Sequence, residues 1–246
     1  MPWETLLLLL VAGVAAGLVG YLMGLASLIS FPALLAAGLP PLAANVTNTV
    51  SLMGIGIGAT AKSARPLFGS SHVGLKRQIP IALAGGTIGA VLLIAGGEEV
   101  FATIVPLLVL MGSIAVLISP RLRKMSGDTD RPRLYLVGMF IVCIYGGYFG
   151  AGAGVLFLAM ILIGTATPMA FALMQRAFLL GIANLVSATI FVFIAPVAWA
   201  AALAMGTGCL IGGVLGPVVA DYIPERGLRW AVAIAGVGLA IWLGFA

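Results

Sequence analysis

Long apolar segments separated by short polar turns run through the whole chain. Five segments fall in the first half, at 5–24, 25–38, 42–61, 79–96 and 100–118, and five in the second, at 134–150, 151–164, 168–194, 200–219 and 229–246. A stretch of about 20 apolar residues is long enough to cross a bilayer as a helix. The pattern therefore predicts an all-α polytopic membrane protein.

Composition supports this prediction. Hydrophobic residues make up 62% of the chain and charged residues 8%, and the mean hydropathy is +1.23. These values lie outside the usual range of a soluble domain. The first segment, 5–24, has no preceding basic region and is followed by further apolar segments, so we interpret it as a retained helix and not a signal peptide.

The two halves of the chain repeat one another at a constant offset. The same residues recur 127 positions later in an ungapped series that includes tyrosine and proline as well as glycine. Self-similarity of this kind indicates internal repeats. We predict a first repeat at 1–118, a linker at 119–133 and a second repeat at 134–246. The matching pairs are Gly20-Tyr21 with Gly147-Tyr148, Pro41 with Pro168, Gly54-Ile55 with Gly181-Ile182, and Gly85-Gly86 with Gly212-Gly213.

The second segment of each repeat is unusually short. At about 14 residues, 25–38 and 151–164 would rise only about 21 Å as helices, against a hydrocarbon core of about 30 Å. Short segments bounded by glycine and proline at matching places predict broken or re-entrant helices that meet at a transport site. The alternative is that the glycines only permit close helix packing. The candidate backbone and hinge residues are Gly20, Gly24, Pro41, Gly147, Gly150, Gly152, Gly154 and Pro168.

Loop charges predict the orientation of the repeats. Basic residues gather in the loop 62–78 and in the linker 119–133, so both should be cytoplasmic. If all five segments cross, the repeats are inverted, both termini are external, and Arg226 and Arg229 are also cytoplasmic. If the short segments re-enter, the repeats are parallel and these two arginines become external. The inverted arrangement fits the charges better. The same distribution explains the net charge of +5 without nucleic acid.

Arg176 lies inside the apolar segment 168–194, and the nearest carboxylates along the chain are Asp130 and Asp221. Ionisable groups at membrane depth are costly, and they usually face a cavity or a ligand. A fixed positive charge there predicts an anionic ligand. The alternative is that Arg176 is close enough to the segment end to extend its guanidinium to the lipid headgroups.

An anion site also needs hydrogen-bond donors, and the third segment of each repeat supplies candidates. Each of these segments begins just after a proline turn, so its first turn carries unpaired N–H groups and the positive end of the helix dipole. The 127-residue offset pairs Asn48 with Gln175 and Thr49 with Arg176. Asn and Thr in membrane helices also simply hydrogen-bond to neighbouring helices, which is the structural alternative. The candidate substrate-binding residues are Asn45, Thr47, Asn48, Thr49, Gln175 and Arg176.

Other chemistry is disfavoured by the sequence. The chain has no phosphate-binding Gly-x-x-x-x-Gly-Lys motif and no nucleophile paired with a base, so we expect neither an ATP-driven pump nor an enzyme. Cys143 and Cys209 lie in apolar surroundings without metal-ligand spacing, and we interpret them as packing thiols. We expect no metal and no cofactor.

Motifs in both repeats resemble one known family. The runs Gly17-Leu-Val-Gly-Tyr-Leu-Met-Gly24 and Phe31-Pro-Ala-Leu-Leu, the turn Gly38-Leu-Pro-Pro, and later Gly146-Gly-Tyr-Phe-Gly-Ala-Gly-Ala-Gly154 are similar to signatures of the sulfite exporter TauE/SafE family. The resemblance implies transport of sulfite, sulfoacetate or related sulfur-containing anions across the cytoplasmic membrane. One departure is Gly24-Leu-Ala-Ser27, which stands where the family usually has a triple glycine.

Two functions remain as hypotheses. The leading one is a secondary transporter or facilitator in the inner membrane that exports a small sulfur-containing anion, with the lipid bilayer and a second copy of the chain as expected partners. The alternative is a non-transport membrane protein whose Gly-rich core makes it an assembly or signalling partner.

Overall fold

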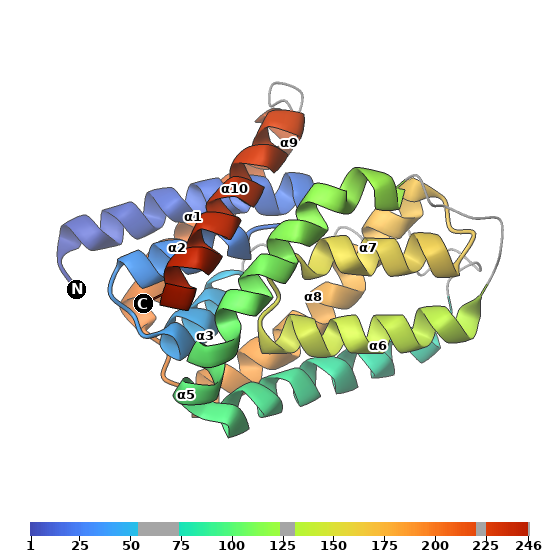
Figure 1. Cartoon of the computed structure of the whole chain (residues 1–246), viewed down its shortest axis with the longest axis horizontal. Coiled ribbons are helices and arrows are strands. Elements are labelled where there is room, and N and C mark those ends of the chain that lie inside the picture. The colour runs from blue at the N-terminus through green and yellow to red at the C-terminus, as the bar shows by residue number, and fades with distance from the viewer. Residues whose placement is uncertain (54–73, 124–130, 220–224, 246) are drawn as a thin grey trace.

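The computed structural model describes residues 1–53, 74–123, 131–219 and 225–245. Helices account for nearly all of these residues, and the described parts contain no strand (Figure 1). The first half forms α1 (Trp3–Met23), α2 (Ser27–Ala36), α3 (Pro41–Ser51) and α5 (Leu75–Arg123). The second half forms α6 (Pro132–Tyr148), α7 (Ala153–Gly164), α8 (Met169–Ile194), α9 (Trp199–Val219) and α10 (Glu225–Phe245).

Most of these bounds lie within a few residues of the predicted segments, but α3 ends at Ser51, whereas the predicted third segment continued to 61. α5 contains a sharp break at Gly97, where φ is 70° and ψ is −171°, so it is two helices that meet at the predicted turn before Glu98. Several predicted features lie outside the described residues: the end of the third segment at 54–61, with Gly54-Ile55, most of the basic loop 62–78, and the centre of the linker at 124–130. The structure does not describe the side chain of Arg226 either.

The fold class is confirmed as an all-helical, membrane-spanning architecture. Among the described residues, four helical stretches are long and apolar enough to cross a bilayer: Trp3–Met23, Leu75–Ser119, Phe171–Ile194 and Trp199–Gly216. α2 and α7 have only 10 and 12 residues, which correspond to rises of about 15 and 18 Å, well short of the hydrocarbon core. Both predicted short segments are therefore short helices.

Helix packing is reciprocal between the two halves. α1 packs along α9, and α6 packs along α5. A Cβ atom on Gly89 of α5 would lie 2.7 Å from the Tyr148 nitrogen of α6, and one on Gly216 of α9 would lie 2.6 Å from Cγ of Tyr21 on α1. Both pairs are related by the 127-residue offset. Glycine allows these helices to approach closely, as small residues do in many membrane proteins.

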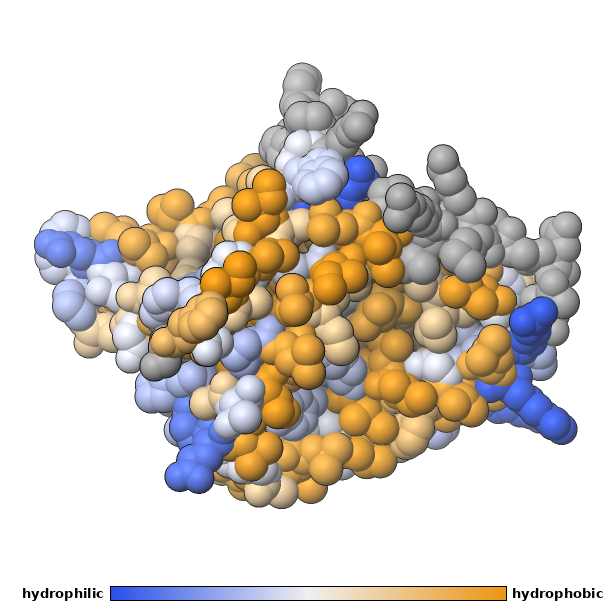
Figure 2. Space-filling model, viewed as in Figure 1, coloured by the Kyte–Doolittle hydropathy of each residue, from blue (hydrophilic) through white to orange (hydrophobic). Residues whose placement is uncertain are grey.

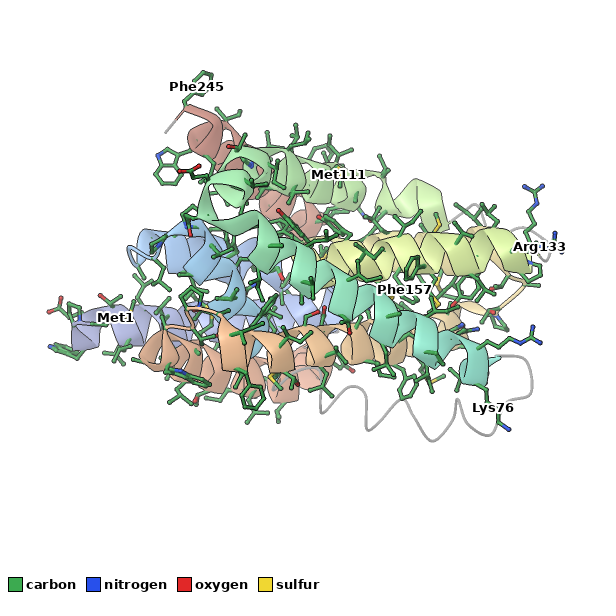
Figure 3. All side chains as sticks on the ribbon, turned by 90° about the horizontal axis from the view of Figure 1, so that it is seen from below. Met1, Lys76, Met111, Arg133, Phe157 and Phe245 are labelled. Atoms are coloured by element: carbon green, nitrogen blue, oxygen red, sulfur yellow. The ribbon has the colours of Figure 1, made fainter. Side chains whose placement is uncertain are left out.

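Residues near the two chain ends lie at the same end of the molecule, away from described residues at the edges of the basic loops (Figure 3). Met1 and Phe245 are at one end of the molecule, and Lys76 and Arg133 are at the opposite end (Figure 3). The first half therefore begins at one end and the second half begins at the other. This is the placement that inverted repeats require; the repeat boundaries and the membrane orientation remain predictions.

The face of the molecule seen in Figure 2 is broadly apolar between these ends. Large hydrophobic side chains are exposed on several helices, for example Leu107 at 62%, Val137 at 58% and Phe193 at 80%. In water such a surface would favour aggregation, whereas lipid tails solvate it well. By contrast, Cys143 and Cys209 are buried thiols within the helix packing.

Aromatic packing fixes the junction between the halves. Phe149, in the turn between α6 and α7, packs edge-on against Phe31 of α2 with ring centroids 5.2 Å apart. It also contacts Phe101 of α5, with centroids 5.9 Å apart. All three rings are buried. Edge-to-face aromatic pairs are favourable geometries, so this cluster holds the turn of the second half against the first half.

Candidate functional site

A cavity of about 140 Å³ lies where two helical turns meet. One turn joins α1 to α2 and the other joins α6 to α7. A Cβ atom on Gly154 would lie 2.9 Å from the carbonyl oxygen of Gly24, so the two turns are in direct contact. The lining comprises Gly20, Gly24, Ala26, Ser27, Leu52, Gly150, Gly154, Arg176, Ala177, Leu180, Gly181 and Asn184.

Glycine is required at both turns by backbone conformation. Gly24 ends α1 with φ at 73°, and Gly150 has φ at 81°. Residues with a Cβ rarely adopt this left-handed conformation, which costs them about 1–2 kcal/mol. The predicted hinge positions therefore correspond to real changes of chain direction, and these changes bring main-chain atoms to the cavity wall.

Arg176 projects from α8 into this cavity. Its Nη1 atom donates a hydrogen bond to the carbonyl oxygen of Met23, 3.3 Å away, at the C-terminal end of α1. The negative end of a helix dipole favours a cation at that position. A Cβ atom on residue 24 would lie 2.8 Å from Nη1, so glycine at this position also leaves space for the guanidinium. The guanidinium therefore contacts α1 within the protein.

Two helices begin at the cavity. Ala26 and Ser27 stand at the start of α2, and Gly154 stands in the first turn of α7. The positive end of a helix dipole lies at the helix start, which favours an anion there. Several first-turn N–H groups here already donate to turn carbonyls, for example Leu28 to Leu25 and Val155 to Gly152, so the dipole is the main contribution of these helix starts. The predicted helix starts were those of the third segments, α3 and α8. Of the described residues of these segments, only Leu52, just past the end of α3, and residues of α8 from Arg176 onward line the cavity.

The predicted polar residues of α3 are bonded elsewhere. Asn45 Nδ2 donates to the carbonyl oxygen of Tyr148 at 2.8 Å, and Thr47 Oγ1 accepts from the Ala198 nitrogen at 3.0 Å. Asn48 Oδ1 accepts from the Ser30 hydroxyl, and Thr49 donates to the carbonyl oxygen of Asn45. None of these four α3 side chains is part of the cavity lining.

Gln175 is also turned away from Arg176. Its Nε2 atom donates to Gln78 Oε1 at 2.8 Å and to the Tyr135 hydroxyl at 2.9 Å. The described hydrogen bonds of Gln175 and Asn48 have no partner in common. The physical reason is helix geometry: consecutive residues point in directions about 100° apart, so Gln175 and Arg176 face different neighbours.

The remaining predicted backbone residues lie at helix contacts or at helix starts. A Cβ on Gly147 would lie 2.5 Å from the carbonyl oxygen of Gly86, and one on Gly152 would lie 2.9 Å from Cα of Gly112, so both glycines permit close packing on α5. Pro41 is the first residue of α3, and Pro168 directly precedes α8. The contacts of Gly147 and Gly152 therefore fit the alternative that these glycines permit close helix packing better than a role at the transport site.

Ser27 and Asn184 are cavity residues that were absent from the predicted site. Asn184 lies eight residues after Arg176, which places both on one face of α8 with Ala177, Leu180 and Gly181. This spacing could have identified Asn184 as a candidate from the sequence. Ser27 ends the Gly24-Leu-Ala-Ser27 run that departs from the family pattern. Together with Arg176 and two helix starts, these groups make a donor-rich wall, and no carboxylate is among the described lining residues.

The comparisons with known proteins agree with this architecture. A family model described as "Sulfite exporter TauE/SafE" matches residues 9–243. A "Probable membrane transporter protein ORF9" from Sinorhizobium sp is 30% identical, with 99% of this chain and 94% of that protein covered. "Probable membrane transporter protein YfcA" from Escherichia coli K12 is 28% identical over 82% of this chain and 75% of its own length.

A third relative, a "Probable membrane transporter protein" from Haemophilus influenzae, is 29% identical over 87% of this chain and 84% of that protein. No solved structure matches the chain significantly. The family match spans both halves of the chain and therefore includes the cavity with Arg176.

Proposed function

Because the chain belongs to the sulfite exporter TauE/SafE family, and is accordingly a multi-pass membrane transporter and not an enzyme, we propose that it exports a small sulfur-containing oxyanion. Sulfite is the reference substrate for this proposal, and small organosulfonates belong to the same chemical class. The substrate would bind in the cavity that holds Arg176.

The placement of Arg176 carries the proposal. A sulfite-like anion presents several acceptor oxygens and no apolar surface, so a selective site needs donors and a fixed positive charge. The cavity supplies a guanidinium, the Ser27 hydroxyl and the Asn184 amide, beside the starts of α2 and α7. Its volume of about 140 Å³ suits a small anion better than a large organic one.

The proposed mechanism follows from the two turns. The cavity lies where a turn of the first half touches a turn of the second half, at Gly24 and Gly154. In transporters built from repeats, movement of one repeat against the other exposes a central site to each side in turn. We propose that separation of these turns opens the Arg176 cavity.

The driving force proposed is the membrane potential. Within the described helices, no carboxylate lines the cavity to carry a coupled proton. An inside-negative potential favours anion exit by about 2.3 kcal/mol per charge for each 100 mV. The membrane potential is therefore sufficient to drive export without a coupling ion.

Flux measurement tests the function directly. Purified protein in proteoliposomes loaded with labelled sulfite should release it when a potassium diffusion potential is imposed, and protein-free liposomes should not. Unlabelled organosulfonate on the same side should slow this release, whereas chloride at equal concentration should not. If the reconstituted protein releases no sulfur-containing oxyanion, the transport proposal fails and the assembly or signalling alternative is favoured.

A further inference from the structure

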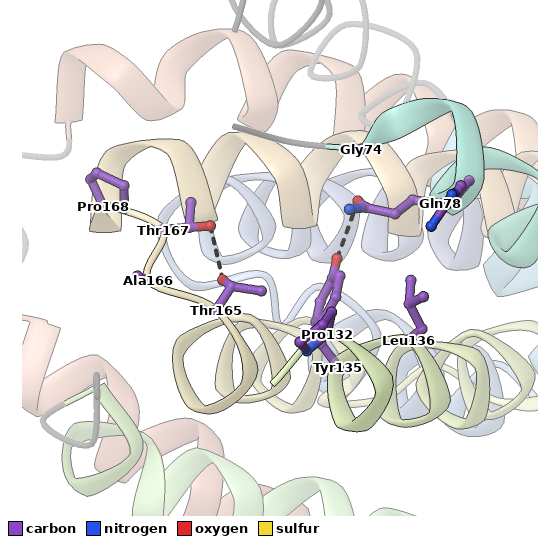
Figure 4. Close-up of a pocket in the computed structure, with 10 residues that line it drawn as sticks. Gly74, Gln78, Pro132, Tyr135, Leu136, Thr165, Ala166, Thr167 and Pro168 are labelled. Carbon is purple, nitrogen blue, oxygen red and sulfur yellow. Dashed lines mark hydrogen bonds between the residues drawn. The ribbon is translucent and has the colours of Figure 1, made fainter. Parts of the chain in front are cut away.

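A second and larger cavity lies at the basic end of the molecule. Its volume is about 420 Å³, and it is bounded by the starts of α5 and α6 and by the connection from α7 to α8 (Figure 4). Lys76 and Arg133, which are at this end in Figure 3, are sequence neighbours of residues in the cavity wall. The function proposed above makes no use of this cavity.

A buried amide forms part of the cavity wall. Gln78 is only 7% exposed. Its Oε1 atom accepts from Gln175 Nε2 at 2.8 Å and from the Tyr135 hydroxyl at 3.3 Å. Its Nε2 atom donates to no described residue, although Gln78 lines the cavity. This donor is open to the cavity and not enclosed by protein, so it can donate to a ligand that carries acceptor oxygens.

The other polar groups of the wall favour the same kind of ligand. The hydroxyls of Thr165 and Thr167 lie 2.8 Å apart on the opposite side (Figure 4), and Thr165 donates to the carbonyl oxygen of Ile161, so the Thr167 hydroxyl is the one that can donate to a ligand. Arg77 adds a guanidinium at the exposed rim. The described lining contains no carboxylate. A cationic rim combined with the Gln78 amide and the Thr167 hydroxyl matches an oxyanion, because such a ligand presents several acceptor oxygens.

α8 connects this cavity to the first one. Gln175 is 1% exposed and bonds to Gln78 and Tyr135 in the wall, whereas the next residue, Arg176, lines the first cavity. Two neighbouring residues of α8 therefore support the wall of one cavity and line the other. An oxyanion at the basic end would sit directly behind the helix that presents Arg176.

We infer that the 420 Å³ cavity is an outer oxyanion site, from which the anion passes to Arg176. This inference rests on the proposed function, because it assigns the cavity to the same substrate. The same donors would also suit inorganic phosphate as a regulatory ligand, so the experiment must separate the two anions.

Equilibrium binding tests the outer site independently of transport. Arg176→Gln protein in nanodiscs made only of zwitterionic lipid should still bind labelled sulfite, because the outer site is intact. Adding Arg77→Gln should weaken that binding about threefold to fivefold, the range for a partly exposed charge. Absence of saturable sulfite binding to Arg176→Gln would overturn the inference, as would displacement of sulfite by an equal or lower concentration of phosphate.

Kinetics supply the second test, with a matched control. In everted vesicles, where the cytoplasmic face is outside, Arg77→Gln should raise the KM for sulfite uptake about threefold to fivefold and leave the maximal rate unchanged. Lys76→Gln removes the same charge from the neighbouring residue, which is not among the described lining residues, and should change KM by less than about twofold. Equal effects of the two variants would contradict a specific site and indicate only surface charge.

The two proposals can fail separately. If wild-type protein carries no sulfite but Arg77-dependent binding persists, the proposed transport function fails. If flux depends on Arg176 but Arg176→Gln binds no sulfite, only the outer site fails.

Discussion

Arg176 Nη1 lies 3.3 Å from the carbonyl oxygen of Met23, and this hydrogen bond joins two residues 153 positions apart. It connects α8 of the second half to the last residue of α1 in the first half. Because Met23 is followed by the Gly24 turn, the bond lies at the point where the chain changes direction. Any movement that separates the two halves must change this contact, so the cationic group is placed to respond to opening.

Gly24→Ala should strongly reduce sulfite flux. Alanine at φ 73° costs about 1–2 kcal/mol in backbone strain. In addition, its Cβ would lie 2.8 Å from Arg176 Nη1, so the guanidinium must move. Flux in proteoliposomes and thermal stability should both be measured, since backbone strain lowers stability and displacement of the guanidinium lowers transport.

Gly38→Ala is the matched control. Gly38 also has a left-handed backbone, with φ at 87°, but a Cβ there meets no atom within 4 Å. This variant should lose similar stability and keep its flux. Equal loss of flux in both variants would show that backbone strain, and not displacement of Arg176, causes the defect.

Asn184→Ala should weaken substrate binding without unfolding the protein. Asn184 is half-buried in the cavity wall, on the same face of α8 as Arg176. Loss of one hydrogen bond of about 1 kcal/mol corresponds to a KM for sulfite raised roughly fivefold.

Thr189→Ala serves as a comparison on the same helix. Thr189 is exposed and donates to the carbonyl oxygen of Leu185 within α8. Its replacement should leave KM within about twofold of wild type, as expected for a surface substitution. If Asn184→Ala also leaves KM unchanged, the amide does not contact the anion.

Much of the fold could be predicted because its signals are local. Segment lengths predicted most helix bounds within a few residues of those observed, including the break at Gly97, but not the end of α3 at Ser51. Gly24 and Gly150 could be recognised as turn positions because each lies in a glycine-containing run between two apolar segments. These features depend on hydrophobicity and backbone conformation, both of which a sequence displays directly.

The site was only partly predictable because it depends on which face of each helix is turned toward the cavity. Arg176 was identified because a charged side chain inside an apolar segment is energetically costly and therefore usually has a specific role. Its neighbour Gln175 was grouped with it, but the helix turns the two side chains toward different partners. Asn48 was expected to face the ligand, yet it accepts a hydrogen bond from Ser30, which no spacing along the chain reveals. The helix starts at the cavity belong to α2 and α7, and only the tertiary arrangement shows this.

Cysteine labelling tests the proposed orientation. The native cysteines are buried, so background reaction with a membrane-impermeant maleimide should be low. Lys76→Cys and Arg133→Cys should react only from the cytoplasmic side, and Trp3→Cys and Phe245→Cys only from the external side. Reaction of Trp3→Cys and Phe245→Cys from opposite sides would contradict the inverted arrangement.

Sulfite efflux from proteoliposomes containing wild type, Arg176→Gln or Arg176→Lys tests the central claim most directly. We predict that Arg176→Gln loses nearly all flux while remaining folded, because the cavity loses its fixed positive charge. Arg176→Lys should also be impaired, since lysine keeps the charge but lacks the planar set of donors that matches an oxyanion. Unchanged flux in Arg176→Gln would contradict the account; full flux in Arg176→Lys with none in Arg176→Gln would mean that a point charge is enough.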